Sequence, residues 1–229
     1  MKNSLVIICL LVPFLSCAQQ IGNPMFSINN GIISTNSQFI DSYHDPEVAN
    51  DPYGSGNTVG VQVGNVNYVI KTAIFTGFGW DNDPDPGYYI IEVSANNQIK
   101  FVHKQNSAFV TRDMEYQGFT LQQHADNDYF IKAPLSNEAT ALIFVGWSYA
   151  NNPSQLFIVV LTETDVKVVY NKPMVINSIT QSGYNFSMAT QSNVLEWVNG
   201  AEQGTPITHT IYQQDGVLYF KDNLVISTK

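Results

Sequence analysis

Cysteine is almost absent from this sequence. Of its 229 residues only Cys9 and Cys17 are cysteines, and both lie near the N-terminus. The remainder of the chain can therefore form no disulfide, build no cysteine-ligated zinc site and supply no thiol nucleophile. Without such cross-links the folded part must be held together by its hydrophobic core, and a chain of this length buries enough apolar surface to do so.

Positive charge is also scarce. The chain has 10 Lys and Arg residues against 19 Asp and Glu residues, which gives a formal net charge of −9. An acidic surface repels the phosphates of nucleic acids and of anionic lipids, so we exclude both as ligands of the folded part. The charge balance remains compatible with a cation, a neutral glycan or a basic protein partner.

The common signatures of catalysis are missing. The sequence has no G-x-S-x-G elbow, no H-E-x-x-H pair and no glycine-rich phosphate loop. A glycosidase needs only two carboxylates that the fold brings together, and nothing in the sequence singles out such a pair. We therefore assign no catalytic residue and leave enzyme activity as an alternative to a non-enzymatic function.

Long apolar runs are missing too, with one exception near the N-terminus. Leu5 to Leu15 is an apolar run that follows Lys2 and precedes small residues. A membrane-spanning helix needs about 20 apolar residues, and this run is too short. Its position and its flanks are typical of a secretory signal peptide, which we predict over residues 1–18.

Two processing routes fit this segment. Cleavage after Ser16-Cys17-Ala18 would release a soluble protein that begins at Gln19. Alternatively, Leu15-Ser16-Cys17 resembles the lipobox of bacterial lipoproteins, and Cys17 would then carry the lipid. A membrane contact is expected only through that anchor. Both routes predict export, to the periplasm, to the outer membrane or out of the cell.

Beyond the signal, helical periodicity is rare and strand-like alternation of apolar and polar residues is frequent. Asn, Gly, Pro and Asp interrupt the alternating runs at short intervals, as turns between strands do. Strands are predicted at 59–63, 67–71, 88–95, 99–104, 140–147, 155–162 and 166–170. The sequence thus predicts a single all-β domain over residues 19–229.

Local signals predict one hairpin and two short helices. Asp215-Gly216 lies between ITHTIYQQ and VLYFK and supplies the positive φ angles that a type I′ turn requires. Asp45-Pro46-Glu47 offers an N-cap followed by proline at the first helical position. Ser192 to Asn199 is a second candidate helix, although NVLEWV suits a strand equally well.

An internal repeat covers residues 67–104 and 128–171. FTGFGWDNDPDPGYYIIEVSANNQIKFVHK resembles FVGWSYANNPSQLFIVVLTETDVKVVYN, and the separation of Trp80 from Trp147 recurs without a gap at several further pairs. Upstream, NYVIK and DYFIK match at a slightly different separation. Each copy reads as a four-stranded antiparallel meander.

Two such meanders can face each other as a sandwich or stand side by side as blades, and two units are too few to close a propeller. We predict an antiparallel sandwich-like or two-sheet domain built from the two duplicated four-strand meanders. The flanking N- and C-terminal strands are expected to complete the two sheets.

The loop GWDNDPDPGYY is the strongest candidate for a metal site. Asp81, Asp83 and Asp85 alternate along it, and hard oxygen ligands of this kind bind Ca²⁺. The alternative is a solvated connection whose Asp and Pro residues end the strands. The corresponding loop of the second copy, SYANNPSQ, has no carboxylate, so the fold does not need a metal at this position.

Aromatic residues gather around the same two loops. Trp80 and Trp147 hold the same place in both copies, which favours a packing role. Tyr88, Tyr89 and Tyr149 are not repeated in this way, and we predict that they contribute to a ligand surface, because exposed aromatic rings stack on sugars.

The histidines point to packing rather than to a metal. His103 alternates with Ile99 and Phe101, and His209 alternates with Ile207 and Ile211, so both are expected to lie on apolar strand faces. No pair of histidines has the spacing of a catalytic zinc site.

Together these features predict an exported bacterial envelope domain that binds a protein or a glycan without catalysis; a specific version is an inhibitor that masks a basic partner. One alternative is a carbohydrate-active enzyme or sugar-binding protein that uses the loop aromatics and carboxylates. The other is a structural or assembly component that associates through its sheet edges.

Overall fold

The computed structural model describes residues 22–41, 55–78, 84–105, 108–109, 115–116, 119–120, 130–147, 155–192, 197–198, 201–202 and 207–223. Side chains are described for residues 22–41, 58–73, 90–104, 130–145, 155–192 and 207–223. Within these ranges the chain is built of strands and one short 3-10 turn, η1 (Ser37–Phe39), which confirms the all-β prediction. The same ranges hold no helix long and apolar enough to cross a membrane.

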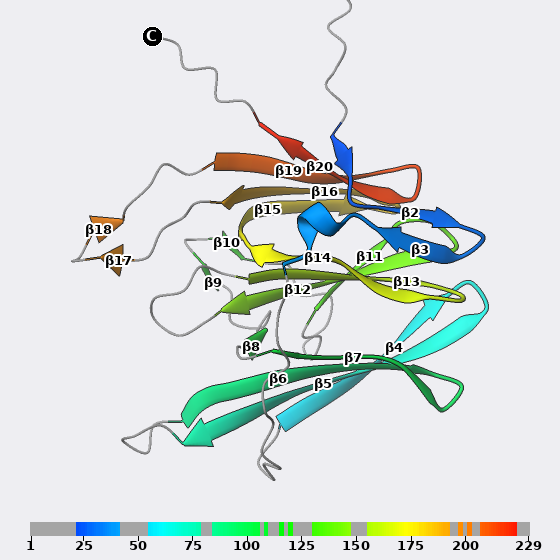
Figure 1. Ribbon diagram of the computed structural model, residues 1–229, viewed down its shortest axis with the longest axis horizontal. Helices are drawn as coiled ribbons and strands as arrows, with labels where there is room; N and C mark the ends of the chain where they lie inside the picture. The colour runs from blue at the N-terminus through cyan, green and yellow to red at the C-terminus, as the bar shows by residue number, and fades with distance from the viewer. Residues whose placement is uncertain are drawn as a thin grey trace, which may run out of the picture.

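Three antiparallel sheets are stacked in layers (Figure 1). The lower sheet is a meander of β4 (Ser55–Val63), β5 (Val66–Phe78), β6 (Pro84–Ala95) and β7 (Gln98–Gln105). The middle sheet is a second meander of β11 (Ile131–Pro134), β12 (Ala139–Trp147), β13 (Gln155–Thr162) and β14 (Val166–Pro173), and β8 (Ala108–Phe109) pairs with β12.

The upper sheet gathers strands from both ends of the chain. Its order is β1 (Asn23–Pro24), β20 (Val217–Asp222), β19 (Ile207–Gln214), β16 (Asn185–Ser192) and β15 (Val175–Ser182). Short two-stranded pairs flank the stack: β2 (Phe26–Asn29) with β3 (Ile32–Thr35), β9 (Glu115–Tyr116) with β10 (Phe119–Thr120), and β17 (Trp197–Val198) with β18 (Ala201–Glu202).

This arrangement corrects the two-sheet expectation. The two meanders do face each other as in a sandwich, but the flanking strands do not complete their sheets. They form a third sheet that covers the second face of the middle meander. Sequence alternation could not reveal this, because it records how many faces of a strand are buried and not which element buries them.

The middle sheet is buried on both faces, and β13 shows why. Its sequence LFIVVLT is apolar without alternation, as expected of a strand that has cores on both sides. Leu156, Ile158 and Val160 belong to the core shared with the upper sheet. Phe157, Val159 and Leu161 belong to the core shared with the lower sheet.

The two meanders agree in register where their last two strands pair. In the lower sheet Ile91 lies opposite His103, and in the middle sheet Ile158 lies opposite Tyr170, at the separation seen in the sequence repeat. The upstream match does not hold in the structure. Lys71 lies in β5, the second strand of its meander, whereas Lys132 lies in β11, the first strand.

The hairpin loop between β19 and β20 carries the positive φ angles that its sequence predicts. Asp215 and Gly216 have φ angles of 51° and 79°, which confirms the predicted turn between β19 and β20. For Ser192 to Asn199 the sequence left a helix and a strand open, and the described residues 192, 197 and 198 favour the strand. Ser192 ends β16, and Trp197–Val198 form a strand, so the strand alternative for NVLEWV is the better one there. The candidate helix at Asp45-Pro46-Glu47 lies outside the described residues.

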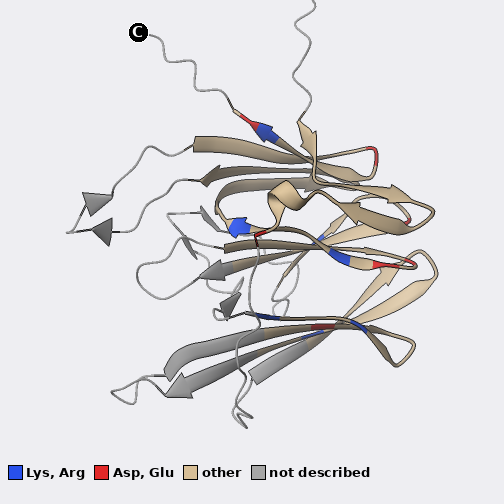
Figure 2. Cartoon of the chain, viewed as in Figure 1, with Lys and Arg blue, Asp and Glu red and all other residues tan. Residues whose placement is uncertain are grey.

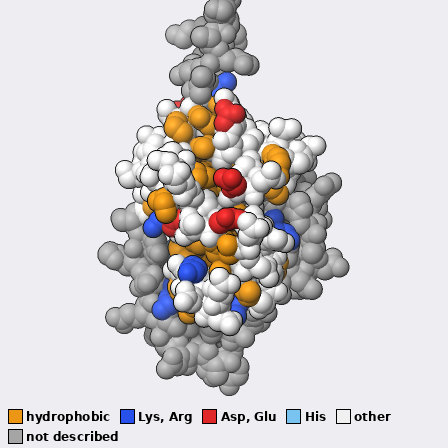
Figure 3. All heavy atoms as spheres, turned by 90° about the vertical axis from the view of Figure 1, so that its right-hand side faces the viewer, with side chains coloured by type: hydrophobic (Ala, Val, Ile, Leu, Met, Phe, Trp, Pro, Cys, Tyr) orange, Lys and Arg blue, Asp and Glu red, His pale blue; other side chains and the backbone are white. Residues whose placement is uncertain are grey.

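Hairpin turns from the three layers gather at one end of the stack, and acidic side chains lie among them (Figure 3). The β13–β14 turn of the middle sheet contacts its neighbours on both sides. Asp165 Oδ2 accepts a hydrogen bond from the Ile33 amide of β3 at 3.0 Å. Glu163 Oε1 accepts one from the Asn65 side chain of the β4–β5 turn at 3.1 Å. We call these contacts the turn clasp.

The raised pKa values of two buried tyrosines link the free energy of unfolding to pH in the alkaline range. Burial raises the pKa of the Tyr170 hydroxyl far above its ordinary value, and the negative charge of Asp41 adds to the shift. The pKa of Tyr68 is raised by burial and then by Asp165 and Glu163. In both cases the neutral phenol is the form that the folded state favours.

We therefore expect stability to be unaffected by these groups below about pH 10 and to fall above it. Above about pH 10 the tyrosine hydroxyls ionise in the unfolded chain but stay neutral in the folded one. The free energy of unfolding then falls by up to about 1.4 kcal/mol per pH unit for each tyrosine. Tyr170→Phe keeps the ring, which packs against both Phe39 and Phe220, and is expected to reduce the slope of stability against pH. Urea unfolding at pH 9, 10 and 11 measures the slope of the free energy of unfolding against pH. An unchanged slope in the variant would count against a role of Tyr170 in the pH dependence.

Candidate functional site

The predicted calcium ligands fall largely beyond the described residues. Asp81 and Asp83 lie outside them, and for Asp85 the backbone alone is described, in β6 opposite Gly77. Glu92, farther along β6, pairs with Lys71 at 3.4 Å. No group of three or more metal-binding side chains occurs among the described residues. The calcium site stays a prediction.

The side chains of the predicted ligand-binding tyrosines also lie outside the described residues. The backbones of Tyr88 and Tyr89 lie in β6, opposite Phe75 and Ile74, and their side chains are not described. Tyr149 lies outside the described residues, as does Cys17, the predicted lipidation site. A site must therefore be sought among side chains that the structure places.

The outer face of the upper sheet is the most distinctive described surface. Pairing across the sheet places every second residue of β15, β16 and β19 on this face, away from the middle sheet. One row crosses four strands through Thr180, Ser187, Tyr212 and Tyr219. The row spans roughly 14 Å, since neighbouring strands lie about 4.8 Å apart.

Hydroxyl and amide side chains cover most of this face. Those on β15 and β16 are Ser178, Thr180, Ser182, Asn185, Ser187 and Gln191, and those on β19 are Thr208, Thr210 and Gln214. Each is exposed or half-buried. We call this surface the polar face.

The polar face is almost neutral in a strongly acidic chain. Among its described side chains only Lys221, at one end, is charged. Figure 2 shows the strands of the upper sheet free of charged residues apart from the end of β20 and the β19–β20 turn. Charge is concentrated elsewhere, for example in the turn clasp.

Two tyrosines give the polar face an aromatic patch. Tyr212 and Tyr219 lie directly opposite each other on β19 and β20, with ring centroids 5.6 Å apart and an interplanar angle of 19°. The Tyr212 hydroxyl accepts a hydrogen bond from the Gly22 amide at 3.1 Å, which fixes the ring. Both rings are half-buried, so each offers part of its surface to solvent.

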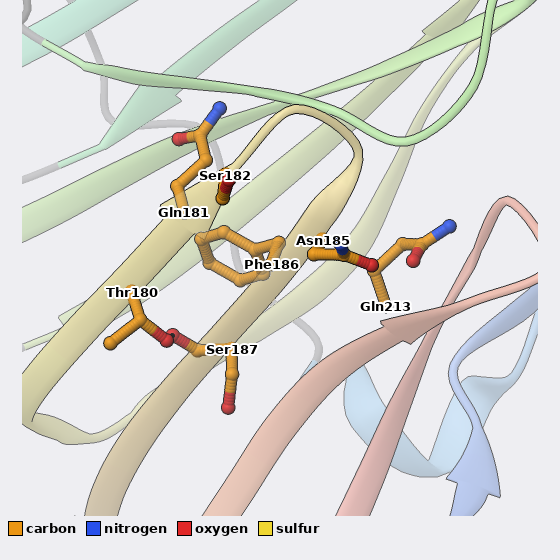
Figure 4. Close-up of a pocket in the computed structure, with 7 residues that line it drawn as sticks. All are labelled: Thr180, Gln181, Ser182, Asn185, Phe186, Ser187 and Gln213. Carbon is orange, nitrogen blue, oxygen red and sulfur yellow. Dashed lines mark hydrogen bonds between the residues drawn. The ribbon is translucent and has the colours of Figure 1, made fainter.

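A shallow hollow of about 210 Å³ lies at the turn end of the β15–β16 hairpin (Figure 4). Phe186 is the one apolar residue that lines it. The others are Thr180, Gln181, Ser182, Asn185, Ser187 and Gln213. The Oε1 atom of Gln181 is buried without a hydrogen-bond partner among the described residues. By the strand register Gln181, Phe186 and Gln213 belong to the inner side of the sheet, so the hollow adjoins the polar face at the β15–β16 turn and does not extend it.

The histidine predictions have two different outcomes. His103 is buried and stacks on Phe157 with ring centroids 4.0 Å apart, which confirms a packing position. His209 is also buried and lies against Phe220. Its ring nitrogens, however, contact Ser192 at 2.6 Å and Asp222 at 2.8 Å. Sequence spacing gave no sign of this group, because its members come from three different strands.

Comparison of the chain with known protein families, with curated proteins and with solved structures finds no match. The chemistry of the described surface is therefore the basis for a functional assignment.

Proposed function

We propose that this chain is an exported envelope domain that binds a neutral glycan on the polar face of its upper sheet. The observation that carries the proposal is the neutrality of that face in a chain with a net charge of −9. Exposed protein surface usually mixes charged side chains of both signs with neutral polar ones, whereas the described part of the polar face carries a single charged side chain, Lys221.

The groups on the polar face match those of a sugar. Sugar hydroxyls both donate and accept hydrogen bonds, as do the hydroxyls of Thr180 and Ser187 and the amide of Asn185. Apolar sugar faces pack on aromatic rings such as those of Tyr212 and Tyr219. The row of Thr180, Ser187, Tyr212 and Tyr219 crosses four adjacent strands, and its side chains are exposed or half-buried, which suits an extended chain more than a compact ligand.

The opposite side of the molecule provides a contrast. The outer face of the lower sheet carries the ion pair of Lys71 and Glu92 and the exposed apolar residue Val102. It therefore has neither the neutrality nor the described aromatic pair of the polar face. Residues on that side serve as controls for changes on the polar face.

Binding is tested by native electrophoresis in gels that contain hydroxyethylcellulose, xylan, galactomannan or glycogen. We expect at least one neutral polysaccharide to retard the protein. Ser187→Glu places a charge in the middle of the row and is expected to weaken binding at least tenfold, because the carboxylate must be desolvated or displace the sugar.

Val102→Glu is the matched control, since it adds the same charge to the opposite outer face, where Val102 is 44% exposed. It is expected to bind as the unmodified protein does. Retardation by none of the four polysaccharides, or equal retardation of both variants, would refute the assignment of the polar face.

The remaining sequence expectations join this proposal. A signal peptide over residues 1–18, with lipidation at Cys17 as the alternative to a start at Gln19, would deliver the domain to the envelope. Duplication of an ancestral meander accounts for the shared register of the pairs Ile91–His103 and Ile158–Tyr170. Calcium at Asp81, Asp83 and Asp85 would be an addition to one copy.

A further inference from the structure

We propose that Ser192, His209 and Asp222 form a nucleophilic site that cleaves small carboxylic esters. The site lies on the inner side of the upper sheet, opposite the polar face, and does not depend on glycan binding there. It goes against the sequence-based expectation of a domain without catalysis. Three observations carry it: the order of the contacts, the fixed imidazole and a buried hydroxyl beside it.

The contacts follow the order that nucleophilic serine chemistry requires. Ser192 Oγ lies 2.6 Å from His209 Nε2, and Asp222 Oδ1 lies 2.8 Å from His209 Nδ1. With Nδ1 protonated and donating to the carboxylate, Nε2 is free to accept the serine proton. An imidazole that only filled a core position would not need both of its nitrogens in this order.

Neighbouring strands hold the three side chains in place. His209 on β19 lies directly opposite Asp222 on β20. On its other side it lies opposite Thr190 on β16, and Ser192 follows two residues later on the same strand. The imidazole is 6% exposed, and its centroid lies 4.8 Å from that of Phe220. The Asn223 amide donates to the Thr208 carbonyl at 3.0 Å, which secures the chain just after Asp222.

Thr190 adds an independent sign of a polar ligand. Its side chain is completely buried, and its hydroxyl has no hydrogen-bond partner among the described residues. A buried hydroxyl without a partner is costly, so such groups call for an explanation. Thr190 lies opposite His209, so the inner side of the sheet at this point is more polar than the packing of an imidazole alone requires.

Access limits the size of the substrate. Ser192 is half-buried, and the side chain of Asp222 is 67% exposed, so the group opens to solvent at the rim of the upper sheet. The imidazole behind it is closed in by Phe220. We therefore expect esters of short, unbranched acids such as acetic acid to react faster than esters of bulky ones.

The reaction balances without a cofactor. Ser192 Oγ bonds to the ester carbon while His209 Nε2 takes its proton; the bond to the alcohol oxygen then breaks, and this oxygen receives the proton. Water next attacks the acyl carbon and gives a proton to His209. The bond to Ser192 breaks, the proton returns to Oγ, and the products are an acid and an alcohol.

Reaction with a fluorophosphonate tests the nucleophile, because Ser192 Oγ would displace fluoride from phosphorus and keep a stable label. Peptide mass spectrometry of the full folded chain is expected to find the label on Ser192. Ser192→Ala should abolish it, and Ser27→Ala, at an exposed serine of β2, should not. Absence of label at Ser192 in the folded protein would overturn the proposal.

Asp222 is a positioning residue, and its variants separate chemistry from folding. Asp222→Asn is expected to slow both labelling and the release of p-nitrophenol from p-nitrophenyl acetate at least tenfold while the thermal midpoint stays the same. Asp222→Glu should recover part of the rate. Equal rates in all three proteins, or loss of rate only together with loss of folding, would show that the contact is merely structural.

Discussion

Replacement of Phe157 by alanine is expected to lower the free energy of unfolding by about 3–5 kcal/mol, the usual cost of removing a buried phenylalanine side chain. Phe157 lies on β13 of the middle sheet and is completely buried. Its ring contacts His103 of the lower sheet and Phe144 of β12. The variant would leave a cavity between two layers that cannot easily close, because strands on both sides hold their spacing.

Urea unfolding followed by circular dichroism measures this change. Val102→Ala is the control, since that side chain lies on the outer face of β7 and is expected to cost less than about 0.5 kcal/mol. If Phe157→Ala cost no more than Val102→Ala, the middle sheet would not be covered by the lower sheet as described.

Removal of the Asp165 side chain is expected to have the next largest effect, a loss of about 2–4 kcal/mol. Its two oxygens accept hydrogen bonds from the amides of Ile33, at 3.0 Å, and Val166, at 2.9 Å, and the side chain is 17% exposed. Hydrogen bonds to a charged group contribute about 1.5–3 kcal/mol, and an amide left without a partner adds a penalty.

Asp165→Asn keeps one carbonyl oxygen as an acceptor and is expected to lose less than Asp165→Ala. Glu138→Ala, at an exposed acidic residue in the β11–β12 connection, should be close to neutral. Chemical denaturation of the three variants measures their free energies of unfolding. An Asp165→Ala protein as stable as Glu138→Ala would mean that the turn clasp contributes nothing to stability.

Local sequence signals predicted much of the fold. The Asp215-Gly216 turn and the strands from 155 to 162 and from 166 to 170 follow from φ preferences and apolar patterning, which act over a few residues. The apolar run of β13, which does not alternate, is consistent with its burial on both faces. What local pattern could not supply was the partner for the second face, because that partner is assembled from strands at both ends of the chain.

The described surface and the serine–histidine contact were harder to predict. Ser178, Thr180 and Ser182 alternate along β15, but the sequence analysis did not predict this strand, so its polar face was not anticipated. The approach of Ser192 to His209 was not anticipated either, since it depends on the register between β16 and β19. Register between distant strands is a tertiary property that no short motif encodes.

Hydrogen–deuterium exchange in the presence of a hexasaccharide from the retarding polysaccharide tests the central claim, that the polar face is the ligand surface. The account predicts slower exchange in peptides that cover residues 180–187 and 207–214, with no change in residues 79–89 or 148–155. Protection confined to those two loop segments would contradict it and would instead support a site at Tyr88, Tyr89 and Tyr149.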